Sequence, residues 1–315
     1  MTTSGGSDTF TLGTVAGELN LTARDGGVTF TATTLGGRTT VDTDGGADVF
    51  NVGTISGELL VTSAGGNATF NADTVGGQAT VTASGGENLI NLRSVNGETN
   101  IDLGTQVGGA FANTIKLGTV DGILNINATG SEGDFTIEQG NGNATINSVG
   151  GPVDLTLESL NGTLDFDATG GVVTAVVHSL DGSATFDSDD GTAYDDVFEL
   201  HSITGDSTFN SHAGDDVFRI YRIGGPGATT ASSVSTTINA GDGNDTFCMN
   251  HVSPAGAGNQ CTVPPLYPDN VGIAGTLNVH GQNGSDLYFF GLTGQYNATI
   301  NAFDVSPSDL SLIHI

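Results

Sequence analysis

Phe50-Asn-Val-Gly-Thr-Ile-Ser-Gly-Glu-Leu-Leu-Val61 is followed twenty residues later by Phe70-Asn-Ala-Asp-Thr-Val-Gly-Gly-Gln-Ala-Thr-Val81, and the two stretches match in pattern. Each begins with an aromatic residue and has an aliphatic residue five places on. A glycine follows two places later, and another aliphatic residue stands four places after the glycine. A fixed period of roughly 20 to 50 residues is typical of stacked repeats, in which each unit packs on its neighbours.

The same period runs through most of the chain, with apolar residues recurring at fixed places around a glycine. Polar residues alternate with these apolar ones, which predicts β-strands whose every second side chain faces the core. The recurring glycines are spaced by 20 apart from steps of 25 and 23: Gly17, Gly37, Gly57, Gly77, Gly97, Gly122, Gly142, Gly162, Gly182, Gly205 and Gly225. The residues at the aromatic position include Phe10, Phe30, Phe50, Phe70, Ile90, Ile115, Phe135, Leu155, Phe198, Phe218 and Phe247.

These patterns predict an all-β fold, a parallel β-solenoid of the β-helix or β-roll kind with coils of about 20 residues. Coils stacked roughly 4.8 Å apart bond through their backbones and place like side chains over like. The general preference for right-handed crossovers predicts a right-handed coil, and tight corners predict positive φ at the recurring glycines. A β-sandwich or barrel with regular hairpins is the alternative, but its strands have no reason to repeat one residue at one place.

The repeat also predicts how the chain is organised. Residues 1–225 carry regular coils, and residues 226–308 continue them irregularly with Ser/Thr-rich and Pro-rich loops. Residues 309–315 break the repeat and are interpreted as a non-native tail. Met1 lies inside a repeat, so we expect the chain to be a fragment of a longer protein.

The chain is strongly acidic, with 35 Asp and Glu against 6 Lys and Arg and a formal net charge of −29. Binding to nucleic acid or anionic lipid depends on Lys and Arg displacing counterions. We therefore expect no nucleic-acid partner. No apolar run is long enough to cross a bilayer, so we expect no membrane insertion within these residues.

An aspartate stands two residues before the aromatic position in several repeats, as in Ala240-Gly-Asp-Gly-Asn-Asp-Thr-Phe247. This stretch resembles the G-G-x-G-x-D-x-U-x nonapeptide of the repeats-in-toxin family, a parallel β-roll that binds Ca²⁺. The resemblance implies that aspartates and loop carbonyls of successive coils share Ca²⁺, a hard cation that takes about six to eight oxygens. The metal ligands that it implies are Asp195, Asp196, Asp215, Asp216, Asp242, Asp245 and Asp286.

The motif is interrupted in the first half of the chain, where Asp8 and Asp48 lie two coils apart with Val28 between them. An alternative role for all these aspartates is an Asx-turn, in which the side chain bonds to its own backbone. Cys248 and Cys261 are the only cysteines, and a disulfide in an oxidising compartment is favoured over a reduced core pair.

Nothing in the sequence supports catalysis. The histidines, among them His178 and His201, have no nucleophile partner and no metal-ligand spacing, and we expect them at the surface. Arg219, Tyr221 and Arg222 near Asp216 give only a faint likeness to a site that cuts acidic polysaccharide, so we expect no enzyme.

The sequence predicts a structural or adhesive repeat region of a secreted or cell-surface protein, stabilised by Ca²⁺ and presenting a surface for glycans or other surface proteins. One alternative is an ice-binding solenoid, which needs a regular outward row of threonines. Thr22, Thr62 and Thr82 begin such a row, but Asp42 and Asp102 interrupt it. A polysaccharide-active β-helix enzyme is the further alternative.

Overall fold

The structure is a computed structural model of the chain. It describes residues 1–104, 112–130, 132–188, 193–224, 233–249, 261, 272–290, 295–304 and 311–314. These residues form strands, turns and bends, and no helix occurs among them. Their contacts divide the chain into two units, Met1–Asp154 and Leu155–Ile315.

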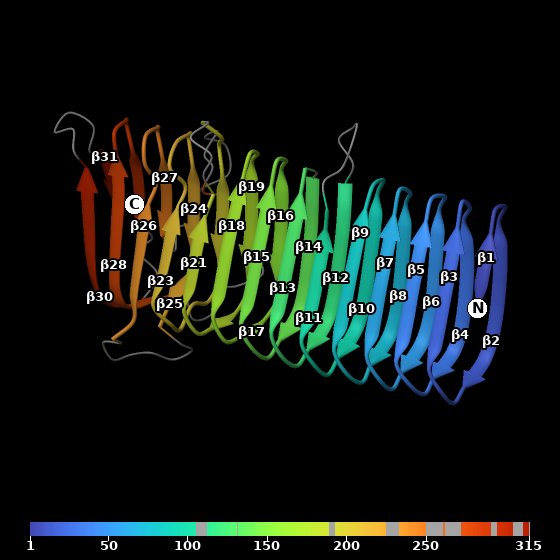
Figure 1. The fold of residues 1–315 in the computed structure, drawn as a ribbon. Helices are drawn as coiled ribbons and strands as arrows, with labels where there is room; N and C mark the ends of the chain where they lie inside the picture. The colour runs from blue at the N-terminus through green and yellow to red at the C-terminus, as the bar shows by residue number, and fades with distance from the viewer. Residues whose placement is uncertain are drawn as a thin grey trace. The chain divides into compact units, whose positions relative to one another are not determined.

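The first unit contains two sheets whose strands alternate along the chain (Figure 1). The described pairs in each sheet are all parallel. One sheet consists of β1 (Thr2–Ser4), β3 (Leu19–Arg24), β5 (Thr39–Asp44), β7 (Leu59–Ala64), β9 (Ala79–Ser84), β11 (Thr99–Leu103), β13 (Leu124–Thr129) and β15 (Ala144–Val149). The other consists of β2 (Asp8–Val15), β4 (Val28–Leu35), β6 (Asp48–Ile55), β8 (Ala68–Val75), β10 (Asn88–Val95), β12 (Ala112–Val120) and β14 (Glu132–Gly140).

Residues at the same place in the repeat pair directly with one another. Phe10 pairs with Phe30, Phe30 with Phe50 and Phe50 with Phe70. The rings of Phe50 and Phe70 stack with their centroids 5.6 Å apart. The predicted column of aromatic residues is therefore confirmed, and the parallel coils of a β-solenoid replace the β-sandwich alternative.

Alternate side chains of each strand fill the core, as the periodicity predicts. In β4, Val28, Phe30 and Ala32 are buried in alternation, and after a break in the alternation Leu35 is buried as well. Fully burying one such side chain contributes about 1.5 to 3 kcal/mol. One coil has too few of these residues to be stable alone, so the coils stabilise each other by stacking.

The glycines serve two different purposes. Gly45 and Gly46, in the turn after β5, have φ of 78° and 81°. Residues with a Cβ rarely adopt these backbone angles. Gly57 does not lie in this region, so the prediction of positive φ at that corner is wrong. A Cβ on Gly57 would lie 2.8 Å from the carbonyl carbon of Gly37 in the coil before. Close approach of successive backbones is therefore the reason for glycine there.

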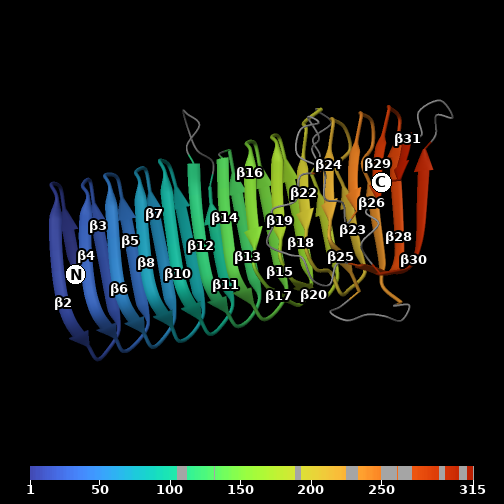
Figure 2. The ribbon, with the colours of Figure 1, turned by 180° about the vertical axis from the view of Figure 1, so that it is seen from behind.

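The second unit again contains two sheets of parallel strands, seen from behind in Figure 2. The first consists of β18 (Leu164–Thr169), β21 (Ala184–Asp187), β23 (Ser207–Asn210), β26 (Ser235–Asn239) and β28 (Gly272–Gln282), on which β25 (Arg222–Ile223) and β30 (Gln295–Asp304) also pair. The second consists of β19 (Val173–Val177), β22 (Val197–Leu200), β24 (Val217–Ile220), β27 (Thr246–Met249), β29 (Leu287–Phe290) and β31 (Ser311–His314). The short strands β17 (Leu160–Asn161) and β20 (Leu180–Asp181) pair with each other, and β16 (Val153–Leu157) includes residues of both units.

The aromatic column of the second unit is continuous over four coils. The rings of Phe198 and Phe218 stack at 5.0 Å, those of Phe218 and Phe247 at 5.4 Å, and those of Phe247 and Tyr288 at 4.8 Å. Aromatic pairs of this kind contribute about 0.5 to 1.5 kcal/mol beyond their burial. This column fixes the register of the strands that carry the predicted metal ligands.

The predicted segments can be compared with the structure only in part. The Ser/Thr-rich and Pro-rich loops fall on residues 225–232, 250–260 and 262–271, outside the described residues. Within residues 226–308, β26, β27, β28 and β29 pair in parallel with strands of preceding coils. In the segment excluded as a tail, Ser311–His314 pairs with β29, a strand that the repeat pattern did not predict.

Candidate functional site

Four of the predicted ligands form one inward column in the second unit. Each precedes the strand that carries the aromatic column by one residue, and each is completely buried. The strands pair with Val197 opposite Val217, and the following pairs continue this register, so the four side chains occupy equivalent places in successive coils. They are Asp196, Asp216, Asp245 and Asp286.

Each of these carboxylates accepts a hydrogen bond from the backbone of the coil before it. The N–H of Val173 donates to Oδ1 of Asp196 at 2.8 Å, and the N–H of Asp196 donates to Oδ1 of Asp216 at 2.8 Å. The N–H groups of Asp216 and Asp245 donate in the same way to Asp245 at 2.9 Å and to Asp286 at 3.0 Å. These bonds run between coils, and they differ from the Asx-turns that the alternative interpretation requires.

The second carboxylate oxygens have unequal surroundings. Oδ2 of Asp196 accepts from the hydroxyl of Ser188 at 2.6 Å. Ser211 occupies the equivalent place beside Asp216, but its hydroxyl donates to the carbonyl of Ala240 at 3.1 Å. Oδ2 of Asp216 and Oδ2 of Asp245 are buried and have no hydrogen-bond partner. A buried carboxylate oxygen without a donor or a cation is strongly unfavourable in its charged form.

This environment favours the protonated acids. Burial raises the pKa of Asp196 to about 6, that of Asp216 to about 7 and that of Asp245 to about 8. The neighbouring hydroxyls, Ser188 at Asp196 and Ser211 at Asp216, offset part of the pKa increase, as do backbone N–H groups. Neighbouring carboxylates add to the increase. At neutral pH the column therefore needs protons or a bound cation to neutralise it.

The other three predicted ligands lie on the outer surface. Asp195 and Asp215 are exposed, and the N–H of Asp215 donates to Oδ1 of Asp195 at 2.9 Å. Oδ1 of Asp242, also exposed, accepts from the Asn283 side-chain amide at 2.6 Å. The structure thus separates the seven predicted ligands into four buried and three exposed residues.

The residues present fit a hard cation such as Ca²⁺ in the chemistry of their oxygens. Across the residues that the structure describes, no three His, Cys, Asp or Glu side chains come together as a metal site. A cation beside Oδ2 of Asp216 or Asp245 would therefore take most of its ligands from backbone carbonyls and water, as the repeats-in-toxin resemblance implies.

The first unit has the same hydrogen bond, which sequence reasoning missed. The N–H of Val28 donates to Oδ1 of Asp48 at 3.0 Å, and the N–H of Ala68 donates to Oδ1 of Asn88 at 3.2 Å. The Asn88 amide also donates to Oδ1 of Asn113 at 3.0 Å. Asp48 was identified from the sequence, and a search for Asn as well as Asp two residues before the aromatic position would also have found Asn88 and Asn113.

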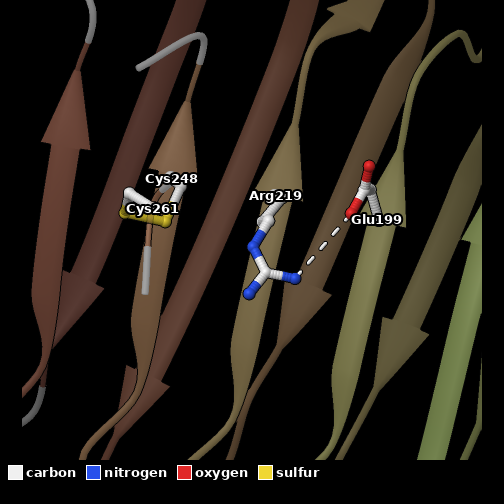
Figure 3. The surroundings of a disulfide bond; sticks show 4 residues. All are labelled: Glu199, Arg219, Cys248 and Cys261. Carbon is white, nitrogen blue, oxygen red and sulfur yellow. Dashed lines mark ion pairs between the residues drawn. A yellow bond between two sulfur atoms is a disulfide. The ribbon is translucent and has the colours of Figure 1, made fainter. Parts of the chain in front are cut away.

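Cys248 and Cys261 are joined by a disulfide, with their Cα atoms 5.5 Å apart (Figure 3). Both are buried and pack with Phe289. On the neighbouring strands, Nη1 of Arg219 lies 3.8 Å from the carboxylate of Glu199 (Figure 3). Disulfides form and persist in oxidising compartments.

Two of the groups that gave a faint likeness to a catalytic site, Arg219 and Tyr221, both contact Glu199. The hydroxyl of Tyr221 donates to Oε1 of Glu199 at 3.4 Å, and the Tyr221 ring stacks on His201 at 4.5 Å. The ring of His201 also lies 4.7 Å from that of His178, tilted against it. The His201 side chain is only 9% exposed, so the expectation of a surface position is wrong for His201. The hydrogen bond from His201, followed by the charges of His201 and Arg219, holds the pKa of Glu199 below its usual range.

The fold and this site define the chain as a parallel β-solenoid with an internal column of aspartates in its second unit. Comparisons with models of protein families, with curated proteins and with solved structures found no match. The described residues include no helix with the length and hydrophobicity needed to span a membrane.

Proposed function

We propose that this chain is a structural and adhesive repeat region of a secreted or cell-surface protein, and that Ca²⁺ stabilises its C-terminal coils. The observation that carries the proposal is the pair of buried, unpartnered oxygens, Oδ2 of Asp216 and Oδ2 of Asp245. A carboxylate column in this environment costs stability when ionised, and Ca²⁺ bound at these oxygens would neutralise it without removing the bonds that Oδ1 accepts.

The exposed carboxylates support the same proposal by a different route. Asp195, Asp215 and Asp242 add negative charge over the turns that precede the column. Their field raises the local concentration of divalent cations near these turns. They are therefore expected to aid the capture of Ca²⁺ more than its final coordination.

Two further features favour a structural role outside the cytosol. The disulfide between Cys248 and Cys261 is the kind of cross-link found in secreted and cell-surface proteins. Stacked coils present extended outer surfaces, and such surfaces suit binding to glycans or to other surface proteins.

The outer surface gives no specific support to ice binding. Thr22, Asp42 and Thr62 pair in one outward row, followed in register by Thr82 and Asp102. Carboxylates therefore interrupt the row of threonines, as the sequence indicates.

Thermal unfolding in calcium and in chelator tests the proposal. If free Ca²⁺ is 100-fold above its Kd, linkage predicts about 2.7 kcal/mol of added stability, which is a rise of several degrees in Tm. Magnesium at the same concentration should give a smaller rise, because it requires a stricter octahedral shell. An unchanged Tm in calcium and in chelator would contradict calcium binding.

Two matched variants locate the effect. Asp216→Asn with Asp245→Asn removes the unpartnered oxygens and should abolish most of the calcium response. Asp195→Asn with Asp215→Asn removes the same charge from the outer surface and should keep most of it. Equal loss in both variants would point to general charge screening and would contradict binding at the inward column.

A further inference from the structure

The first unit carries a trough of about 530 Å³ on the outer face of one sheet, lined by side chains from β4 to β14. This volume lies within the range of roughly 300 to 1,000 Å³ that is typical of ligand sites. The trough is distinct from the aspartate column, since it lies in the other unit and on the outer surface.

A polar row follows the trough from coil to coil. Register places Asn51, Asn71 and Asn91 opposite one another on successive strands, and Lys116 comes next. The Asn71 side-chain amide donates to Oδ1 of Asn51 at 2.8 Å, so these two amides are paired along the row. Successive rungs are roughly 4.8 Å apart, a spacing comparable to the length of one sugar residue in an extended chain.

The row changes at β10 and β12. The ammonium group of Lys116 cannot accept a hydrogen bond from the Asn91 amide. Within the described residues, neither of these two side chains makes a hydrogen bond or an ion pair. Arg93 lies beside them in the lining with its side chain 80% exposed, and its Nε is 4.0 Å from Asp73. A surface pair of this length contributes little, so three donor groups remain available in the middle of the trough.

These donors are unusual for this chain. Lys and Arg total 6 in a chain of net charge −29, and Arg93 and Lys116 line the same trough, which Asp73 and Glu138 also line. Guanidinium and ammonium groups beside an amide suit a carboxylate, which Arg can bind through two parallel hydrogen bonds. The acidity of the rest of the chain disfavours a polyanion with more than one charge per sugar.

We infer that this trough binds an extended acidic oligosaccharide whose uronate carboxylates are spaced along the chain. One carboxylate lies between Arg93 and Lys116, and the hydroxyls of the flanking sugars bond to the amide and hydroxyl groups of the row. No described lining residue is aromatic, so binding depends on the carboxylate and on hydrogen bonds and not on ring stacking. The inference rests on the adhesive part of the proposed function and names its ligand class.

Isothermal titration calorimetry of the full chain tests this inference. The probes are hexamers of galacturonate, of mannuronate and of alternating glucuronate and N-acetylglucosamine, each titrated in chelator so that calcium cannot bridge carboxylates. At least one uronate hexamer should bind, and its fully methyl-esterified form should bind at least tenfold more weakly. A densely sulfated hexasaccharide of similar length should also bind at least tenfold more weakly.

The matched variants are Arg93→Gln with Lys116→Gln, and Arg24→Gln with Arg38→Gln. Both remove two positive charges from the first unit, but Arg24 and Arg38 lie outside the trough and pair with Asp42 and Glu58. The first variant should lose at least tenfold in affinity and the second less than twofold, with circular dichroism showing that both are folded.

Absence of binding to all three uronate hexamers would overturn the inference, and so would equal losses in the two variants. Binding that is unaffected by esterification would also overturn it. None of these results would change the calcium response of the second unit, so failure of this inference is distinguishable from failure of the calcium proposal.

Discussion

Both units contain the same kind of hydrogen bond between coils, from a backbone N–H to Oδ1 of an inward side chain, but the side chain differs. In the first unit Asp48, Asn88 and Asn113 occupy the inward place two residues before the aromatic position, and in the second unit a column of aspartates occupies it. In both, Oδ1 accepts a backbone N–H from the coil before. The other terminal atom of the side chain is Nδ2 in Asn and Oδ2 in Asp. Nδ2 of Asn88 donates a hydrogen bond to Asn113, whereas Oδ2 of Asp245 accepts none.

This difference separates the role of the hydrogen bond from the role of the charge. An amide at this place completes a neutral ladder and is indifferent to pH and to ions. A carboxylate at the same place makes the same bond and adds an unneutralised oxygen, so the second unit is expected to respond to protons and to cations.

The largest expected effect comes from moving the charge into the first unit. Asn88→Asp would face Oδ1 of Asn113 with a buried carboxylate oxygen and lose the amide bond, at a cost of about 3 to 5 kcal/mol at pH 8. Asn51→Asp adds the same charge on the outer face and keeps the bond from Asn71, so it should cost less than about 0.5 kcal/mol. Hydrogen exchange of peptides from residues 48–104 would measure both costs, and similar costs would contradict the assignment of charge as the cause.

The next effect is the pH dependence of the second unit in chelator. The pKa of each of Asp196, Asp216 and Asp245 is raised above the unfolded value of 3.8, so the folded state binds more protons than the unfolded state between these values. This stability is fully present below pH 3.8 and is lost as pH rises through about 6, 7 and 8. Tm should therefore fall over this range.

Thermal melts followed by circular dichroism at pH 5, 7 and 9 would measure this fall. Asp216→Asn with Asp245→Asn should flatten the profile, since Asn does not titrate. Saturating calcium should also flatten or reverse it in the unchanged chain. A Tm that rises from pH 5 to pH 9 in chelator would show that the column is not buried as described.

The smallest effect concerns a feature that the two units share. Asn71 donates to Asn51 at 2.8 Å in the first unit, and Asn239 donates to Asn210 at 2.8 Å in the second, both on the outer face. Asn71→Ala and Asn239→Ala should each cost about 1 kcal/mol, as measured by hydrogen exchange of the local peptides. A much larger cost in one unit would mean that the units differ in more than their inward charge.

Several features of the site could be predicted from residues alone, and others could not. The aspartates before the aromatic position were found because they recur with the repeat. Their direction was not found, since Asp195 and Asp196 are adjacent and chemically identical in the sequence, and only the backbone turns one outward and the other inward. The contact between Ser188 and Asp196 was likewise hidden, because nothing in the repeat pattern brings these two side chains together.

The sequence by itself determined that like residues stack at intervals of twenty, because apolar side chains at Phe30, Phe50 and Phe70 can all be buried at once only in parallel coils. Tertiary structure decided what each polar residue contacts, because those contacts join coils that are far apart along the chain. It also showed why Gly57 cannot have a side chain, since the obstruction is the backbone of the coil before. The period of a sequence predicts which residues are neighbours, but burial, the partner of each oxygen and the resulting pKa depend on the packed coils.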